Sequence, residues 1–562
     1  MKKLMLTAAV SAVLFAGVAN AAITENGAGL PLLNLSDTAQ VFVSGASAPG
    51  NFMDQLFTNN TIPSASRLCD TTKTIYRFQS ASGSPLAANS DQRAYLCVLN
   101  TGSAAGASVA AGAKKNVIVY KRNKDGSAMG VNPLVVGTEG DLVSFLNADV
   151  TSNTGCVKVG AAVNNVVTIN CPWVSGAPAS SQSVVSDLGV SDVEPILFQG
   201  TNGVAGTGNQ PTGFATMDAA SVAKLTVKPA ATQVFGVIVN TKLRNALQMA
   251  QFAPANACNP LSGSPEATLG LAKCQPTLTS ADITSIFTGK IASWKQLYLK
   301  TATASKLNLN VFDNVPAADV NKADSDRVHI CSRTSGSGTR ASFSALFLEE
   351  VCSDTGYAHP SDTTTTVEST LKPQVHNMSS GGNVGKCMNE LNNASYQGTG
   401  TVLTTSNTPA MTGDRWAIGI QGTENNISNS DEYRFIKIDG VEPTLANAAS
   451  GRYKWWSELT FQYNTIHYNN IDSDTRTLID SIVTEAGNKT VAALTNPTAK
   501  HLFGQAGFMA IPQNTTAPQF AIVDLTQPVN PLSRSVGGQP STCRLPTLFN
   551  PGANFLRGLQ MN

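Results

Sequence analysis

Short apolar runs alternate with helical patterns along most of the chain. Two segments carry apolar residues at helical spacing, Leu243 to Ala250 and Ser280 to Phe287. Four apolar runs are typical of buried or half-buried strands: Gln40 to Ser44, Thr74 to Gln79, Val184 to Val190 and Val234 to Asn240. Alternating strands and helices of this kind favour an α/β fold, in which helices cover a sheet.

The helix expected at 280–287 has recognisable ends. Ser280 suits the N-cap, and Gly289 suits the residue just past the C-terminus, where a left-handed conformation is common. We expect its apolar residues and Trp294 to pack between this helix and a sheet, so the segment is structural.

The segment Val328 to Arg340, VHICSRTSGSGTR, reads as a strand, a glycine-rich turn and the start of a helix at about Ala341. The glycines let backbone N–H groups point toward one place, the hydroxyls add donors, and Arg333 offers a planar cationic fork. Phe343, Leu346 and Phe347 then follow at helical spacing for a buried face. A Gly-Ser-Gly sequence alone is often only a turn. With the arginine and the helix start beside it, the segment predicts an anion site.

Four further segments accompany this loop in a fixed order: Gly45-Ala46-Ser47-Ala48-Pro49, Asp187 to Pro195, ITSIFTGKIASWKQL from Ile283 to Leu297, and Trp416 to Ile420. Together they resemble the phosphate-binding subunit of the high-affinity phosphate ABC transporter, a type II periplasmic binding protein. The resemblance covers about residues 39–525, with long interruptions. It implies an α/β protein of two lobes with a ligand cleft between them, closing as two rigid bodies.

The resemblance also implies how the chain is divided. Residues 39–245 would form the first part of lobe one, 246–435 lobe two, 436–526 the second part of lobe one, and 527–562 a C-terminal extension. About residues 90–185 exceed what the family needs, so we expect a β-rich insertion in lobe one, with a hairpin or edge strand at 163–169. The extension is expected to wrap across the body or to contact a partner.

Ligand residues follow from the resemblance on both lobes. On lobe one it assigns Ser47, Ala48, Ser82 at the start of a further helix near Pro85, and Asp192 as acceptor of a phosphate proton. On lobe two it assigns Arg333, Ser337, Gly338 and Thr339. Structural interpretations stay open: Asp192 can cap the turn before Pro195, and Ser47 and Ser82 can be ordinary helix caps. Arg340 is expected at the surface or in a supporting position.

Two positions depart from the family pattern. Ser335 stands where phosphate-specific members usually have an aspartate, so one proton-accepting carboxylate is absent there. Ala48 replaces a large aromatic residue, which widens the mouth of the site. Phosphate stays the first choice of ligand, and a sulfate-like oxyanion or an organic phosphate remains an alternative.

The N-terminus and the cysteines indicate export. Residues 1–21 have a positive start, an apolar stretch and a small-residue cleavage site, as in a secretory signal peptide without a lipid-anchoring cysteine, and no later run is apolar enough to insert in a membrane. Ten cysteines without a Cys-x-x-Cys pair suggest disulfides. Pairing by nearest neighbour joins Cys69–Cys97, Cys156–Cys171, Cys258–Cys274 and Cys331–Cys352, and leaves Cys387 with Cys543. The expected location is the periplasm or the exterior.

Composition and missing motifs narrow the function. A net charge of +1 with 13% charged residues lacks the basic field of a nucleic-acid binder. There is no G-x-S-x-G, no H-E-x-x-H and no nucleotide P-loop, so we expect neither an enzyme nor a bound cofactor or metal. The expected partners are phosphate or a similar oxyanion and an ABC permease. The alternative is a secreted or cell-surface interaction protein that keeps the fold as a scaffold.

Overall fold

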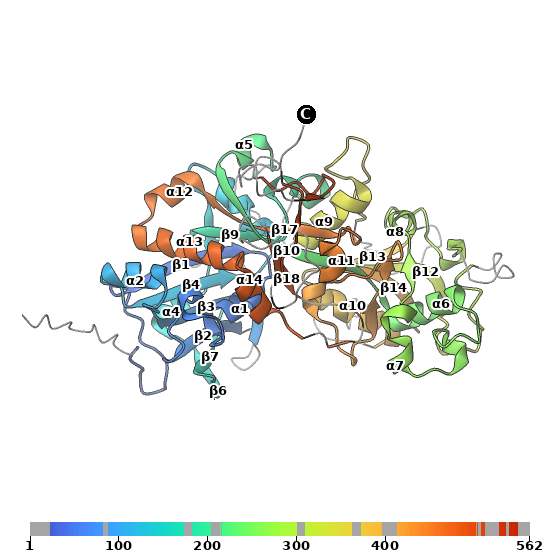
Figure 1. Cartoon of the computed structure of the whole chain (residues 1–562), viewed down its shortest axis with the longest axis horizontal. Helices are drawn as coiled ribbons and strands as arrows, with labels where there is room; N and C mark the ends of the chain where they lie inside the picture. The colour runs from blue at the N-terminus through green and yellow to red at the C-terminus, as the bar shows by residue number, and fades with distance from the viewer. Residues whose placement is uncertain are drawn as a thin grey trace, which may run out of the picture.

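The computed structural model describes residues 23–81, 88–173, 183–203, 214, 216–299, 310–361, 372–395, 413–498, 500–501, 503, 507–511, 526, 528–535 and 539–548. The proposed signal peptide, residues 1–21, lies outside this part of the chain. The described residues form a mixed α/β structure around one large sheet (Figure 1), which confirms the predicted α/β class.

Fourteen strands of the described chain make up the large sheet. They are β1 (Thr38–Gly45), β2 (Ile75–Ala81), β3 (Ala88–Val98), β4 (Asn116–Arg122), β6 (Val157–Val163), β7 (Val166–Pro172), β9 (Leu188–Ser191), β10 (Leu225–Asn240), β12 (Ser325–Arg333), β13 (Gln374–Met378), β14 (Arg415–Gly422), β15 (Tyr433–Phe435), β17 (Trp456–Asn464) and β18 (Phe508–Ala510). The order across the sheet is β13-β12-β14-β10-β17-β9-β1-β4-β3-β2-β7-β6, and β15 and β18 pair with β10.

The long strand β10 joins two halves of this sheet. Its first part, from Leu225 to Val234, pairs antiparallel with β17, and its second part, from Phe235 to Val239, pairs antiparallel with β14. We call β9, β1, β4, β3, β2, β7 and β6 the β1 half, and β12, β13 and β14 the β12 half. Figure 1 shows the two halves on either side of β10 and β17.

Each half contains parallel strands whose carboxyl ends are adjacent. In the β1 half, β1 pairs in parallel with both β4 and β9. In the β12 half, β12 pairs in parallel with both β13 and β14. Loops at the carboxyl ends of parallel strands are where α/β proteins bind ligands. The anion-site residues expected from the sequence follow these strands.

Helices cover the faces of both halves. They are α1 (Gly50–Thr58), α2 (Ala104–Ala111), α3 (Asn132–Val135), α4 (Asn147–Ser152), α5 (Ala219–Val222), α6 (Thr241–Gln251), α7 (Glu266–Leu269), α8 (Ser280–Phe287), α9 (Gly338–Phe343), α10 (Gly381–Asn393), α11 (Leu445–Ala449), α12 (Thr465–Asn470), α13 (Ser473–Ala486) and α14 (Lys489–Thr495). On the β1 half, Leu478 and Ile482 of α13 pack against Val41 of β1 in one buried cluster. Each such fully buried side chain contributes about 1.5–3 kcal/mol.

The helix α8 forms where the local sequence pattern predicts it, but its N-cap differs by one residue. It spans the predicted residues, but its N-cap is Thr279 rather than Ser280, because the Thr279 hydroxyl accepts from Asp282 N and the Asp282 side chain accepts from Thr279 N. Gly289 has a φ of 72° just past the helix, as predicted. Trp294 is fully buried against Trp416, which confirms its structural role.

The single strand predicted at 184–190 is wrong. The segment forms two strands in different sheets, β8 (Ser183–Val185), which pairs with β5 (Leu142–Ser144), and β9. Two polar residues separate them. The Asp187 carboxylate accepts from Phe42 N at 2.8 Å, and the Ser186 hydroxyl donates to Leu188 O at 3.0 Å, so this turn is fixed by side-chain hydrogen bonds.

The segment expected as an insertion, about 90–185, is built into the large sheet. It is β-rich as predicted, but β4 lies between β1 and β3 and pairs with β1 over seven residues, so it is not a peripheral excursion. The hairpin of β6 and β7 is confirmed; it turns at Asn164 and Asn165, both with positive φ, and β6 is the last strand of the sheet order.

Five disulfides link the ten cysteines. Cys69–Cys97, Cys156–Cys171 and Cys258–Cys274 are confirmed, but the other two predicted pairs are wrong. Cys331 pairs with Cys387, and Cys352 pairs with Cys543. Cys331 lies on the face of β12 that α10 covers, in a cluster with Val384 and Cys387, whereas Cys352 packs with a different cluster.

Residues 528–535 and 539–548, here called the C-terminal strap, run across the body. Within the strap, β19 (Leu532–Ser533) pairs with β20 (Thr547–Leu548). The Thr542 hydroxyl donates to Glu194, which follows β9 in the β1 half, and the neighbouring Cys543 is bonded to Cys352 in the β12 half. The strap therefore connects the two halves. In the described part of the chain, no helix has the length and apolar character needed to cross a membrane.

Candidate functional site

The arginine loop begins where β12 ends. Gly336 has a φ of 79°, a left-handed conformation that favours glycine, and it turns the chain into α9. The Ser337 hydroxyl accepts from Arg340 N and caps this helix. The helix starts at Gly338, three residues before the predicted Ala341, because the cap residue is already in place at 337. Thr339 therefore lies in the first turn.

The Arg333 side chain is buried at the carboxyl end of β12, with 6% of the residue exposed. Its guanidinium donates to Thr339 Oγ1 at 3.5 Å and to Ser379 O at 3.4 Å, at the end of β13. Burial lowers the pKa of Arg333, while the charges of Asp192 and Glu424 oppose that shift. Arg340 is buried too and supports the loop, because it donates to Arg333 O and to Thr201 O, both at 3.2 Å.

Asp192 faces this loop from the β1 half, directly after β9. It is 4% exposed, and among the described residues its Oδ1 has no hydrogen-bond partner. Burial raises the pKa of Asp192 to about 6, against the lowering effects of Arg333, Ser127 and Lys121. Asp192 does not cap the turn before Pro195, because Ser191 Oγ accepts from Val193 N there. Asp192 Oδ1 can therefore accept a hydrogen bond from another group.

The two halves touch at Gly338. A Cβ on residue 338 would lie 2.5 Å from Ser127 Oγ and 2.6 Å from Asp192 Cβ, so only glycine fits. Beside this contact, Ala128 N donates to Gly336 O at 2.9 Å. An apolar cluster continues the contact, with Ala128 and Val193 from the β1 half, Ala341 from α9 and Ala345 from the π-helical segment that follows α9.

The loop with Ser47 and Ala48 follows β1. Gly45 has a φ of 112°, and a Cβ there would lie 2.1 Å from Val190 O, so the end of β1 packs closely on β9. Ser47 and Ala48 are half-buried just before α1. Ser47 does not cap that helix, whose N-cap position is Pro49 without a side-chain bond. Ser82 and Pro85 lie outside the described residues.

Lys121, at the end of β4, is a site residue that the sequence reasoning missed. Its Nζ is fully buried and donates to Gly45 O at 3.1 Å and Ala46 O at 3.2 Å, directly beneath the Ser47 loop. Burial lowers the pKa of Lys121 to about 7, and the charge of Asp192 opposes that shift. In the sequence, the only sign of this role was a single lysine at the end of the apolar run 117–120.

Glu424 is the second residue that was missed. It lies in the short 3-10 turn Thr423–Asn425, directly after β14, and it is half-buried. Gln233 Nε2 donates to its Oε2 at 3.0 Å. Burial raises the pKa of Glu424 to about 7, the charge of Asp192 raises it further, and Arg333 lowers it. In the sequence, the only sign of this role was an acid four residues past Ile420, the end of a segment that carries the family resemblance.

The structure therefore gathers most of the predicted ligand residues at one place. Asp192 and the residues Arg333, Ser337, Gly338 and Thr339 lie at adjoining ends of the two halves. Together these segments provide the Arg333 guanidinium, hydroxyl donors and the N-terminus of α9. They also provide two carboxyl groups with a raised pKa, those of Asp192 and Glu424. No group of three or more His, Cys, Asp or Glu side chains within the described residues is placed to hold a metal ion.

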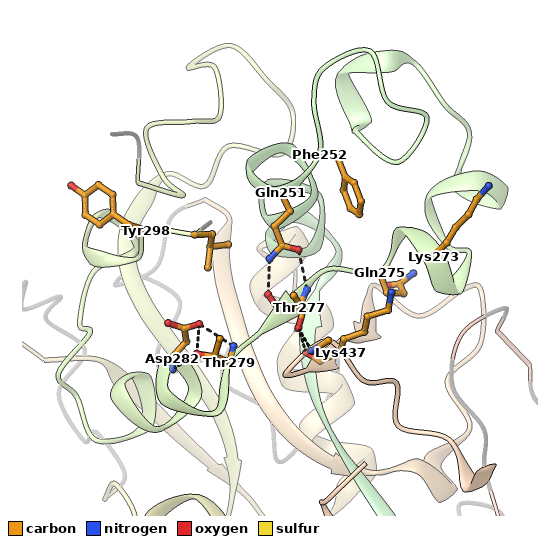
Figure 2. Close-up of a pocket in the computed structure, with 11 residues that line it drawn as sticks. Gln251, Phe252, Lys273, Gln275, Thr277, Thr279, Asp282, Tyr298 and Lys437 are labelled. Atoms are coloured by element: carbon orange, nitrogen blue, oxygen red, sulfur yellow. Dashed lines mark hydrogen bonds between the residues drawn. The ribbon is translucent and has the colours of Figure 1, made fainter. Parts of the chain in front are cut away.

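A separate pocket of about 520 Å³ lies elsewhere on the β12 half (Figure 2), beside α6 and α8. Several of its polar side chains serve the local structure. Gln251 donates to Thr277 O and accepts from Thr277 N, and Asp282 completes the cap of α8 with Thr279. None of the predicted ligand residues lines it.

No family model and no curated protein matches the chain. Among solved structures, a Clostridium perfringens protein with bound phosphate, assigned as a phosphate ABC transporter substrate-binding protein, is 19% identical over 55% of this chain and 77% of its own, with a TM-score of 0.28. An ABC-type phosphate transport receptor from Vibrio cholerae is 15% identical over 48% of this chain and 70% of its own (TM-score 0.24). PstS from Borrelia burgdorferi is 14% identical over 50% and 75% (TM-score 0.23). At TM-scores this low, the likeness assigns neither a family nor a ligand to this chain. The proposed function therefore rests on the residues of the site.

Proposed function

We propose that this chain is an exported solute-binding protein that captures a small oxyanion, phosphate first, between the β1 half and the β12 half. One observation carries the proposal. Arg333 and Asp192 are both buried at the carboxyl ends of parallel strands from opposite halves, and they lie within electrostatic range of each other. In α/β proteins this is where ligands are bound.

Each side of the proposed site has a distinct role. Arg333 supplies charge and a planar pair of donors, and Ser337 and Thr339 add hydroxyls and N–H groups at the start of α9. Bonds from a guanidinium to an oxyanion are charge-assisted, and they strengthen where water is excluded. Ser47 and Ala48 would line the approach from the β1 half. The chain binds rather than catalyses in this proposal.

Asp192 gives the proposed site a preference for protonated anions. A carboxylate accepts a hydrogen bond from an O–H group, but it repels an anion that carries no proton. Phosphate keeps at least one proton near neutral pH, whereas sulfate keeps none. We therefore propose phosphate over sulfate.

Export and delivery belong to the same proposal. Five disulfides are typical of a protein from an oxidising compartment such as the periplasm. Movement of the two halves as separate lobes would admit and release the ligand. Delivery to an ABC permease would then follow.

Isothermal titration of the purified protein with phosphate and then sulfate tests the proposal. We expect phosphate to bind more tightly than sulfate, and Arg333→Ala to lose binding. Arg452→Ala, at an exposed arginine, is the matched control. Thermal unfolding of both variants shows whether the fold is kept. Unchanged phosphate affinity in a folded Arg333→Ala protein would exclude this site.

A second candidate function is that of a secreted interaction protein that uses the fold as a scaffold. The observation that favours it is the C-terminal strap, since Thr542 and Cys543 tie the two halves together. If the titration detects no binding of phosphate or sulfate, this candidate function replaces that of a solute-binding protein.

A further inference from the structure

Two carboxyl groups, not one, lie within electrostatic range of Arg333. Asp192 comes from the end of β9 in the β1 half, and Glu424 comes from the turn after β14. Because β14 is the parallel neighbour of β12, its carboxyl end lies beside the end of β12, where Arg333 stands. The charge of Arg333 lowers the pKa of both acids, which places both within electrostatic range of the guanidinium.

The position of Glu424 is fixed by its neighbours. Gln233 Nε2 donates to Oε2 at 3.0 Å, and Asn425 Nδ2 donates to Oε1 at 3.0 Å. The side chain also folds back over Gly422, where a Cβ would lie 1.8 Å from Oε2. Each carboxylate oxygen has two acceptor positions, so each can accept a further bond. Glu424 is therefore a fixed acceptor and not a mobile surface acid.

Residue 335 does not supply this function. Ser335 is in the loop that follows Arg333, and its hydroxyl is buried without a hydrogen-bond partner among the described residues. A serine hydroxyl can accept a hydrogen bond, but it carries no charge, so it does not replace a carboxylate that accepts from a ligand hydroxyl.

The charges around Glu424 determine which anion suits the site. The charged groups that face it are Asp192 and Arg333, and Lys121 faces Asp192 from behind the Ser47 loop. With both acids ionised, their two negative charges offset those of Arg333 and Lys121, so the site has no surplus positive charge for a fully ionised anion. An anion whose hydroxyls donate to the two carboxylates is therefore favoured over one that carries no proton.

We propose that Glu424 is the second proton-accepting carboxylate of the oxyanion site, so that the site selects a tetrahedral anion with two acidic hydroxyls, inorganic phosphate in its monobasic form. This inference rests on the proposed function. One phosphate hydroxyl donates to Asp192 and the other to Glu424, while the two remaining oxygens accept from Arg333 and from the donors at the start of α9. Gln233 is a positioning residue that orients Glu424.

The proposal distinguishes inorganic phosphate from its relatives. Sulfate has no hydroxyl to offer either carboxylate. A phosphate monoester has at most one acidic hydroxyl, because its ester group occupies the other position. We therefore expect the affinity order phosphate, methyl phosphate, sulfate, with the steps between them set by the number of hydroxyls.

The experiment is a set of titrations with phosphate, methyl phosphate and sulfate at pH 6, 7 and 8. It compares the wild type with Glu424→Gln and with Glu139→Gln, an exposed glutamate as the control. We expect Glu424→Gln to reduce the ratio of phosphate to sulfate affinity by about tenfold or more, the effect of one charge-assisted hydrogen bond. The control should keep the wild-type ratio. An unchanged ratio in Glu424→Gln, with binding still abolished in Arg333→Ala, overturns the role of Glu424 and leaves the proposed function intact.

A measurement on the wild type avoids dependence on any variant. Phosphate titrations at pH 8 in two buffers of different ionisation enthalpy give the number of protons taken up on binding. We expect close to one proton, because dibasic phosphate, the main form in solution at pH 8, must gain one to become the monobasic form that the site binds. Phosphate binding without proton uptake at pH 8 overturns the inference. A wild type that binds no phosphate at all overturns the proposed function as well.

Discussion

Asp192 and Gly338 are in direct contact across the two halves of the sheet. The Cβ and Oδ2 of Asp192 lie 2.6 and 2.8 Å from the place where a Cβ on residue 338 would stand. Gly338 is the first residue of α9, so the contact sets the distance between an acid of the β1 half and the start of a helix in the β12 half.

We predict that Gly338→Ala lowers phosphate affinity by about tenfold or more, because the added methyl group forces Asp192 and Ser127 away from the loop. Titration calorimetry measures the effect. Gly382→Ala in α10 is the matched control, since a Cβ there meets only Ser380 Oγ at 3.9 Å. The control should gain about 0.5–1 kcal/mol of stability from helix propensity and keep its affinity. Equal affinities in the two variants would show that the contact does not shape the site.

The raised pKa of Glu424 predicts a pH dependence of stability without phosphate. A carboxyl group whose pKa is about 7 in the folded protein and near 4.5 in the unfolded chain binds more protons when folded. Its ionised form therefore costs stability, and the cost appears as the pH rises from about 4.5 to 7. We expect the wild type to lose on the order of 1–3 kcal/mol relative to Glu424→Gln over this range.

Urea denaturation of both proteins at half-unit steps from pH 4.5 to 8 measures this difference. Groups that titrate elsewhere cancel in the comparison, so the difference curve reports residue 424. A curve that stays flat, or that favours the wild type as the pH rises, contradicts the assignment of a raised pKa.

The predictions that succeeded depend on local information. The strand β1 and the helix α8 carry their periodicity and caps in a few adjacent residues, so the sequence predicted both closely. The strand, the turn and the helix start at the arginine loop were predicted for the same reason, because Arg333, Ser337 and Gly338 are close in sequence. Whether they bind an anion stays a prediction.

The predictions that failed depend on tertiary packing. Cys331 was paired with Cys352 because they are near in sequence, but the face of β12 that carries Cys331 is covered by α10 and therefore by Cys387. Lys121 and Glu424 were missed because each reaches the site only through the order of strands. The pairing of β4 with β1, and of β14 with β12, brings them there.

The disulfide between Cys352 and Cys543 gives the last prediction. It closes 191 residues and anchors the C-terminal strap on the β12 half, while Thr542 binds Glu194 on the β1 half. The double variant Cys352→Ser and Cys543→Ser should lower the thermal stability, since a native disulfide typically contributes about 2–5 kcal/mol. It should also speed release of phosphate, because the halves are then held together less firmly.

The matched control is the double variant Cys156→Ser and Cys171→Ser, whose disulfide spans 15 residues beside the edge hairpin of β6 and β7. Its removal should lower stability without changing the release rate, because it lies within the β1 half. Stopped-flow displacement of bound phosphate measures release in both variants. If the two variants release phosphate at the same rate, the strap does not restrain the halves, and the observation that favours a fixed scaffold loses its support.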